Sequence, residues 1–221
     1  MSFFGLVSCA HSRSVTAPTA AEQAELTPDG VLEDLMAGNA RFVDGYLSAP
    51  DVKLRRMAGT LGQYPKAVVL SCLDSRVPVE QVFDQGIGDL FVGRVAGNVE
   101  NEDQLGSMEF AAKLSGVKLV MVLGHSACGA VKGACDGAEM GNLTALLSKI
   151  QPAVDSVEGF PTDQRNSKNS AFVERVVRAN VQMTVADIRS RSPILAQMER
   201  DGQIKIVGAV YSLESGEVTL L

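Results

Sequence analysis

The chain has 221 residues, 46% of them hydrophobic, which is enough for one substantial core and argues against a second domain. Its formal net charge is −6 and it has no dense basic run to neutralise a phosphate backbone, so nucleic acid is a poor partner. No stretch approaches the roughly 18 to 20 apolar residues that a membrane-spanning helix needs, so no transmembrane span is expected.

The first 27 residues form an arm ahead of a predicted domain at 28–221. Leu6 to Cys9 resembles the lipobox of bacterial lipoproteins, and a tether rich in Ala, Thr, Pro and Glu follows. The charged start of a secretory signal is missing, and the apolar run is short. The arm is therefore either a residual lipoprotein-type signal or an apolar segment that packs on a partner subunit. Both the bacterial cytoplasm and the periplasm or cell envelope stay open as compartments.

Helical and strand patterns alternate after the arm. Thr27 and Pro28 open a helix whose apolar residues recur at helical spacing, and a charged stretch around Arg55 then leads to a turn at 62–65. Short apolar runs predict buried strands, and helical patterns lie between them. The strands are expected at 67–72, 90–95, 118–124 and 204–211, with 217–221 pairing on the last, and the helices at 105–114, 127–135, 143–150 and 171–188. This alternation predicts a single α/β domain with a central, mostly parallel sheet of four to five strands flanked by helices.

Two short motifs carry metal-binding residue types. Cys72, Asp74 and Arg76 occupy alternate positions after the first strand, and a Gly-His-x-x-Cys motif with His125 and Cys128 follows the third. Two thiolates and one imidazole suit tetrahedral zinc and leave a fourth position for water or a carboxylate. In open α/β sheets, ligands collect beyond the carboxyl ends of the strands, so the two strand ends are expected to converge on one metal.

The spacing within each motif predicts a local geometry. If the chain stays extended past the first strand, Cys72, Asp74 and Arg76 point to one side. His125 and Cys128 are three apart, the spacing of neighbours on one helical face, and a thiolate in the first helical turn gains from the helix dipole. Asp74 is either the fourth ligand of a closed, inert site or the partner of Arg76, which leaves the fourth position to water. The second arrangement favours catalysis, because zinc lowers the pKa of such a water to about 7.

At these residues the chain resembles the β-class carbonic anhydrases, with features of their plant-like subgroup, over residues 28–221. The resemblance implies an enzyme that hydrates carbon dioxide reversibly to bicarbonate and a proton, with one Zn²⁺ per subunit, as a homodimer or a dimer of dimers. It implies Cys72, His125 and Cys128 as the zinc ligands. It further implies that Asp74 and Arg76 form a dyad that orients a zinc-bound hydroxide.

The resemblance also implies a substrate pocket. Gln63 falls in Gly-Gln-Tyr-Pro-Lys, where plant-like members carry a glutamine that hydrogen-bonds the substrate across the dimer interface. Phe91, Ala96 and Phe110 match the apolar wall, and Gly129 lies beside the metal. Core packing is the alternative role for the two phenylalanines.

Several positions depart from the family pattern. Leu73 stands where a small polar residue is common, and Ala96 and Phe110 stand where the plant-like pocket has Val and Tyr. The changes at Ala96 and Phe110 predict a roomier pocket with one hydroxyl fewer, and the Leu73 side chain is expected to point away from the metal. Because the chain has no Trp, it cannot form the Trp-Arg-Tyr bicarbonate pocket of another subgroup, although Arg94 occupies the matching Arg position.

Three other functions compete with carbon dioxide hydration. Some proteins of this fold hydrolyse carbon disulfide or carbonyl sulfide, and a zinc-stabilised binding domain would keep Asp74 on the metal. A thiol redox protein is disfavoured because Cys128 and Cys135 are not in a Cys-x-x-Cys motif. Cys135 is expected to be a small buried residue without a chemical role.

Overall fold

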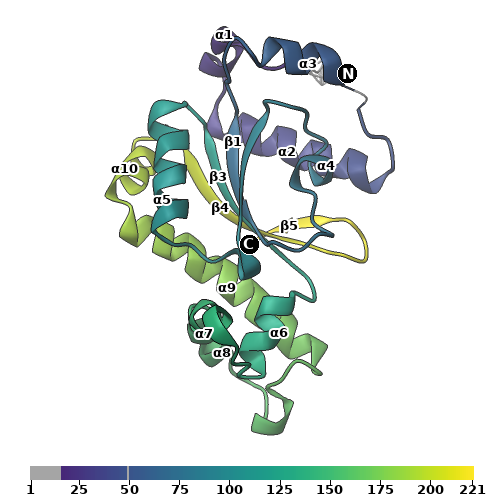
Figure 1. The fold of residues 1–221 in the computed structure, drawn as a ribbon, viewed down its shortest axis with the longest axis vertical. Helices are drawn as coiled ribbons and strands as arrows, with labels where there is room; N and C mark the ends of the chain where they lie inside the picture. Colours follow the sequence, from purple (N-terminus) through teal and green to yellow (C-terminus); the bar gives the residue numbers. More distant parts are fainter. Residues whose placement is uncertain (1–15, 49) are drawn as a thin grey trace, which may run out of the picture.

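A computed structural model of the chain describes residues 16–48 and 50–221. The predicted lipobox at Leu6 to Cys9 lies outside the described residues. Figure 1 shows a central sheet with helices on both faces. The strands are β1 (Ala67–Ser71), β2 (Leu90–Arg94), β3 (Leu119–His125), β4 (Lys205–Tyr211) and β5 (Val218–Leu220), in the spatial order β2-β1-β3-β4-β5. The first four are parallel and β5 is antiparallel to β4, which confirms the predicted α/β fold.

Helices connect the strands and cover both faces of the sheet (Figure 1). The α-helices are α1 (Ala20–Ala24), α2 (Pro28–Val43), α3 (Val52–Ala58), α4 (Val79–Val82), α5 (Glu102–Glu109), α6 (Gly129–Cys135), α7 (Gly141–Leu147), α8 (Gln151–Ser156), α9 (Ser170–Arg191) and α10 (Pro193–Arg200). Short 3₁₀ turns form η1 (Ala96–Asn98) and η3 (Thr162–Gln164), and a π-helical turn, η2 (Phe110–Leu114), continues α5. None of the helices in the described ranges has the length and apolar character needed to cross a bilayer.

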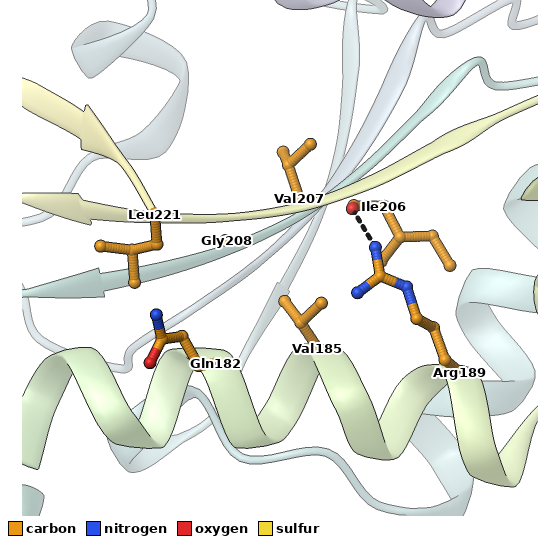
Figure 2. Close-up of a pocket in the computed structure, with 7 residues that line it drawn as sticks. All are labelled: Gln182, Val185, Arg189, Ile206, Val207, Gly208 and Leu221. Atoms are coloured by element: carbon orange, nitrogen blue, oxygen red, sulfur yellow. Dashed lines mark hydrogen bonds between the residues drawn. The ribbon is translucent and has the colours of Figure 1, made fainter.

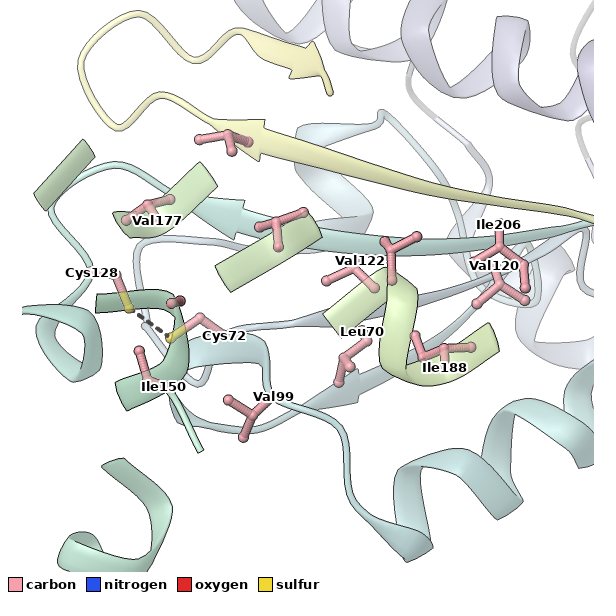
Figure 3. Packing of buried hydrophobic residues seen from close by; sticks show 14 of the residues in the cluster. Leu70, Cys72, Val99, Val120, Val122, Cys128, Ile150, Val177, Ile188 and Ile206 are labelled. Carbon is pink, nitrogen blue, oxygen red and sulfur yellow. Dashed lines mark hydrogen bonds between the residues drawn. The ribbon is translucent and has the colours of Figure 1, made fainter. Parts of the chain in front are cut away.

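Each face of the sheet buries its own apolar core. On what we call the α9 face, α9 packs on strand residues such as Leu70 and Val122, and Figure 3 shows Cys72 and Cys128 at one end of this cluster. On the opposite α2 face, Leu35 of α2 packs with the other strand residues, such as Met121. The division follows from the alternation of side chains along a strand.

Several helical segments differ from the sequence prediction. The charged stretch around Arg55 forms α3, because Asp51 caps it by accepting from Leu54 N at 2.9 Å and because Arg55, only 4% exposed, pairs with Asp89 at 3.0 Å. The predicted helix at 143–150 corresponds to α7, which already ends at Leu147, and a separate helix, α8, begins at Gln151 with Pro152 in its first turn, where proline fits. α10 was not predicted, and neither were α1, α4 and α8; Ser192 caps α10 by accepting from Leu195 N.

The described part of the arm lies against the body of the protein. Gln23 of α1 donates to two backbone carbonyls, Pro65 O at 2.6 Å and Ser115 O at 2.8 Å. Ala17 is buried, and its Cβ lies 3.2 Å from the position that a Cβ on Gly88 would take. These contacts place α1 beside the amino ends of the strands.

An ion pair covers the outer edge of β4 where the short β5 does not reach. Arg189 and Glu199 form two hydrogen bonds of 2.8 Å with each other. Arg189 also donates to Ile206 O at 2.8 Å, and Glu199 accepts from Ile206 N at 3.1 Å. Figure 2 shows Arg189 bonded to this edge beside a pocket of about 250 Å³ between α9 and β4. The backbone groups of Ile206 are therefore satisfied by side chains in place of a neighbouring strand.

Candidate metal centre

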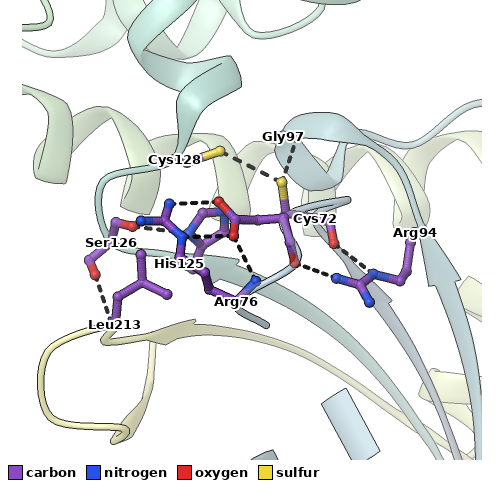
Figure 4. Close-up of polar contacts among 9 residues, drawn as sticks. Cys72, Arg76, Arg94, Gly97, His125, Ser126, Cys128 and Leu213 are labelled. Atoms are coloured by element: carbon purple, nitrogen blue, oxygen red, sulfur yellow. Dashed lines mark hydrogen bonds and ion pairs between the residues drawn. The ribbon is translucent and has the colours of Figure 1, made fainter. Parts of the chain in front are cut away.

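The predicted ligands meet at the carboxyl ends of two adjacent strands. Cys72 directly follows β1 and His125 ends β3, and the two strands pair in parallel. The chain leaves β1 for β2 on one side and reaches β3 on the other, so the strand order reverses here, where open sheets bind ligands. The ligand atoms of Cys72, His125 and Cys128 lie within 4.8 Å of one another (Figure 4). The sequence prediction that both strand ends converge on one site is confirmed.

A tight turn, and not a helical face, brings Cys128 to His125. Ala127 between them adopts a left-handed conformation with φ +54°, and Cys128 precedes α6 as its N-cap with φ −58° and ψ 124°. The prediction that His125 and Cys128 are neighbours on one helical face is therefore wrong, because the helix begins only at Gly129. Ser126 anchors the turn, since its Oγ accepts from Leu213 N at 2.9 Å.

Hydrogen bonding fixes the tautomer of His125. Its Nδ1 lies 3.0 Å from Ser126 O, and a carbonyl oxygen only accepts, so the proton sits on Nδ1. Nε2 is then an acceptor, and it is buried with no hydrogen-bond partner among the described residues. A buried lone pair without a donor is costly unless a cation fills that role. This nitrogen faces the two thiols as a metal ligand would.

The two cysteines have a separation that suits zinc. Their Sγ atoms are 3.8 Å apart, and both side chains are nearly fully buried. A tetrahedral zinc with Zn–S bonds of about 2.3 Å needs a sulfur separation of about 3.8 Å. Without a cation, the hydrogen bond from Cys128 lowers the pKa of Cys72 to about 4, while the same contact and burial raise the pKa of Cys128. The donor set and its spacing therefore fit zinc, which would displace the shared proton.

Asp74 and Arg76 lie together beside this group. Arg76 Nε and Nη2 donate to the two carboxylate oxygens at 2.9 and 2.7 Å, and the Arg76 amide donates to Oδ1 at 2.9 Å. These bonds hold the pKa of Asp74 well below its usual range. Asp74 Oδ2 also lies 3.8 Å from His125 Nε2. The chain is not extended here as predicted: it turns after Cys72, with Val77 N donating to Asp74 O at 3.1 Å, and the turn brings Arg76 back onto the carboxylate.

Three residues around Cys72 were not predicted as part of the site. Arg94, at the end of β2, donates through Nε to Cys72 O at 3.0 Å and through Nη2 to Asp74 O, so it fixes the loop between them. Gly97 donates its amide to Cys72 Sγ at 3.3 Å, and Asn180 of α9 donates to Gly97 O at 2.8 Å. The one sequence signal for Asn180 is a polar residue within an apolar helical stripe.

The predicted pocket residues separate into two groups. Gln63 is exposed and precedes β1, so the length of that strand, about 16 Å, lies between it and Cys72 in one chain. Phe91 pairs in register with Val68 near the start of β1, and its ring lies 6.3 Å from that of Phe110. Phe110 is 49% exposed. These residues gather toward the amino ends of the strands, away from the metal ligands of the same chain.

The other two predicted pocket residues lie nearer to the ligands along the chain. Ala96 is half-buried in η1, next to the glycine that donates to Cys72. Gly129 is exposed and directly follows Cys128, and a Cβ there would meet no described atom within 4 Å. Gly129 is therefore open to whatever approaches the site. Leu73, expected to point away from the metal, is 66% exposed.

Comparisons with known proteins agree with this geometry. Residues 67–218 match the family model described as carbonic anhydrase. The chain is 37% identical to carbonic anhydrase 2 of Mycobacterium tuberculosis, over 87% of this chain and 92% of that protein. It is 39% identical to a carbonic anhydrase of Mycolicibacterium smegmatis, over 87% and 93% of the two chains.

A solved structure extends the agreement to the fold. The β-carbonic anhydrase of Coccomyxa superposes with a TM-score of 0.65 at 25% identity, covering 86% of each chain. The chain therefore belongs to the β-carbonic anhydrases, a family of enzymes that use zinc to hydrate carbon dioxide.

Proposed function

We propose that Cys72, His125 and Cys128 hold one zinc ion per subunit and that this site converts carbon dioxide and water reversibly to bicarbonate and a proton. The observation that carries the proposal is the buried cluster of two thiols and an imidazole nitrogen within 4.8 Å, with Nε2 lacking a donor in the described structure. Zinc in such a site supplies a nucleophile at neutral pH by lowering the pKa of water to about 7. Three protein ligands leave a fourth position for chemistry.

Asp74 and Arg76 orient the reacting hydroxyl. Arg76 contacts both carboxylate oxygens, and this bidentate pairing holds Asp74 in place beside the ligand group without making it a ligand. The lowered pKa of Asp74 keeps it ionised at neutral pH, so it accepts a hydrogen bond and does not donate one. When Asp74 accepts a hydrogen bond from the hydroxyl, a lone pair of the hydroxyl oxygen is directed toward the carbon of the substrate.

The substrate pocket is completed by a second copy of the chain. Gln63 and Phe110 are exposed and lie toward the amino ends of the strands, whereas the candidate ligands of the same chain lie at the carboxyl ends. In a homodimer, or a dimer of dimers, Gln63, Phe91 and Phe110 of one subunit line the metal centre of another, while Ala96 and Gly129 act within their own subunit. The Gln63 amide then offers a donor to a substrate oxygen, and the two rings give the apolar wall that suits an uncharged molecule.

Stopped-flow carbon dioxide hydration from neutral to alkaline pH tests the proposal on protein with verified zinc content. Because Arg76 already engages both oxygens of Asp74, we expect activity at neutral pH. Activity confined to alkaline pH would contradict an open site and would place Asp74 on the metal at neutral pH. A zinc-loaded protein without hydration activity at any pH would contradict the reaction itself.

The Arg76→Ala variant tests the dyad. We expect it to retain zinc and to lose hydration activity by about 100-fold, since an oriented polar group in an active site contributes about that much. Arg175→Ala is the matched control, because Arg175 is exposed on α9, in a different part of the fold. Full activity in zinc-loaded Arg76→Ala would remove the dyad from the mechanism.

A further inference from the structure

A buried amide interrupts the apolar stripe of α9. Asn180 is 3% exposed and lies among Val176, Val177 and Val181, which belong to the core of the α9 face. Burying an amide is unfavourable unless its polar atoms are paired. Asn180 Nδ2 donates to Gly97 O at 2.8 Å, across 83 positions of sequence. A core position of α9 is therefore occupied by a polar side chain that binds one backbone carbonyl of η1.

Gly97 is the residue that this contact holds, and only glycine fits there. Its φ is +73°, in the left-handed region. A Cβ would lie 2.5 Å from Ile150 Cδ1 and 3.3 Å from the Cβ of Ala130. The following residue, Asn98, is also left-handed with φ +46° and donates its amide to Val95 O at 2.9 Å. Two consecutive left-handed residues turn the chain sharply at this point.

The turn aims a backbone donor at a sulfur atom. Gly97 N lies 3.3 Å from Cys72 Sγ, and Figure 4 shows this contact at the sulfur together with Arg94 at the backbone carbonyl of Cys72. A donor to a metal-binding thiolate withdraws charge from the sulfur and fixes its direction, and such outer contacts tune both the affinity and the electronic character of a metal site.

We propose that Asn180 is a positioning residue of the metal centre: it holds Gly97 so that the Gly97 amide donates to Cys72 Sγ. The inference rests on the proposed function, because it takes Cys72 as a ligand. Asn180 acts through Gly97 and contacts neither the ligand atoms nor the substrate. Its position on the longest helix ties the sulfur donor to the rigid core of the α9 face.

Cobalt(II) in place of zinc gives a readout that reports on the sulfur atoms directly. Asn180→Leu removes the donor and keeps a side chain of similar size. We expect the thiolate-to-cobalt charge-transfer band to move to lower energy, because the sulfur loses a hydrogen bond. We also expect zinc affinity, measured by competition with a chelator, to fall by about 10-fold.

Asn39→Leu is the matched control. Asn39 is an equally buried asparagine of the α2 face that donates to Val82 O and Gly216 O and accepts from Val218 N. It should lose stability and leave both the cobalt band and the zinc affinity unchanged. An unshifted band and unchanged affinity in Asn180→Leu, or equal shifts in Asn39→Leu, would overturn the assignment. If Asn180→Leu does not fold, Asn180→Ala removes the same donor and carries the same expectation.

These readouts do not depend on turnover. If the wild-type protein failed to hydrate carbon dioxide but Asn180→Leu shifted the cobalt band, the proposed function would fail and the positioning role would stand. If the wild type hydrated carbon dioxide but the band did not shift in Asn180→Leu, the proposed function would stand and the positioning role of Asn180 would fail.

Discussion

Each face of the sheet has a buried asparagine, and the two asparagines have different roles. On the α2 face, Asn39 makes three hydrogen bonds that tie α2 to the end of α4 and to β5. On the α9 face, Asn180 donates to Gly97 O, and the Gly97 amide donates to the sulfur of Cys72, a proposed zinc ligand. Both asparagines are almost fully buried. The role of a buried asparagine side chain therefore depends on its hydrogen-bond partner and on the contacts that this partner makes in turn.

The same contrast applies to the apolar residues. Cys72 continues the alternation of Val68 and Leu70 on the α9 face, one position beyond the end of β1. The core of that face therefore extends into the candidate metal centre, whereas the core of the α2 face contains none of the three candidate ligands. Substitutions on the two faces should separate metal binding from stability.

The largest effect is expected from removing a ligand. Cys128→Ala should lose its zinc, and hydration should fall to the uncatalysed background, because two ligands hold zinc far more weakly than three. Elemental analysis and stopped-flow assays measure both. Cys135→Ala is the control: burial raises the pKa of Cys135 to about 11, and it is not part of the ligand group. A full zinc complement in Cys128→Ala would contradict the ligand assignment.

The α2 face should respond in stability alone. Leu35→Ala removes a side chain with 0% exposure and should lower the free energy of unfolding by about 3 kcal/mol, measured by denaturant titration. Leu54→Ala on α3, where the side chain is 44% exposed, should change it by less than about 0.5 kcal/mol. Zinc content of the folded Leu35→Ala protein should match the wild type. Zinc loss there would show that the two faces are not independent.

A smaller effect is expected from Arg94, which fixes the loop between Cys72 and Asp74. Arg94→Met should retain zinc and lower kcat by about 10-fold, because the carboxylate is no longer held in its productive position. Arg189→Met is a suitable comparison, since Arg189 also donates to a backbone carbonyl, at Ile206. It should reduce stability and leave kcat unchanged. Equal kcat in wild type and Arg94→Met would show that the turn alone positions Asp74.

Two kinds of feature could be predicted from the sequence: elements with a regular pattern of apolar residues, and polar residues that directly follow a predicted strand. Apolar runs located the four parallel strands, β1 to β4, and the ends of two of them located Cys72 and His125. Local spacing failed at the turns, because the left-handed Ala127 and the Asp74–Arg76 turn follow from what each residue contacts in the folded site. The roles of the substrate pocket residues and of the dyad stay predictions.

Long-range contacts could not be read from local patterns. The sequence showed Arg55 only as part of a charged stretch, and nothing in that stretch indicated that Arg55 pairs with Asp89 inside the protein. Asn180 contacts a residue 83 positions away, and a single polar residue in an apolar stripe does not reveal its partner. Such contacts depend on the complete chain path, which a window of sequence does not contain.

The ion pair over β4 has a consequence for self-association. An uncovered strand edge is a template on which another chain adds a strand, the first step of aggregation through sheets. At Ile206 both outward-facing backbone groups are already bonded to Arg189 and Glu199. An incoming strand would have to displace Arg189 and Glu199 before it could form a backbone hydrogen bond with Ile206. The ion pair therefore opposes edge-to-edge aggregation at this position.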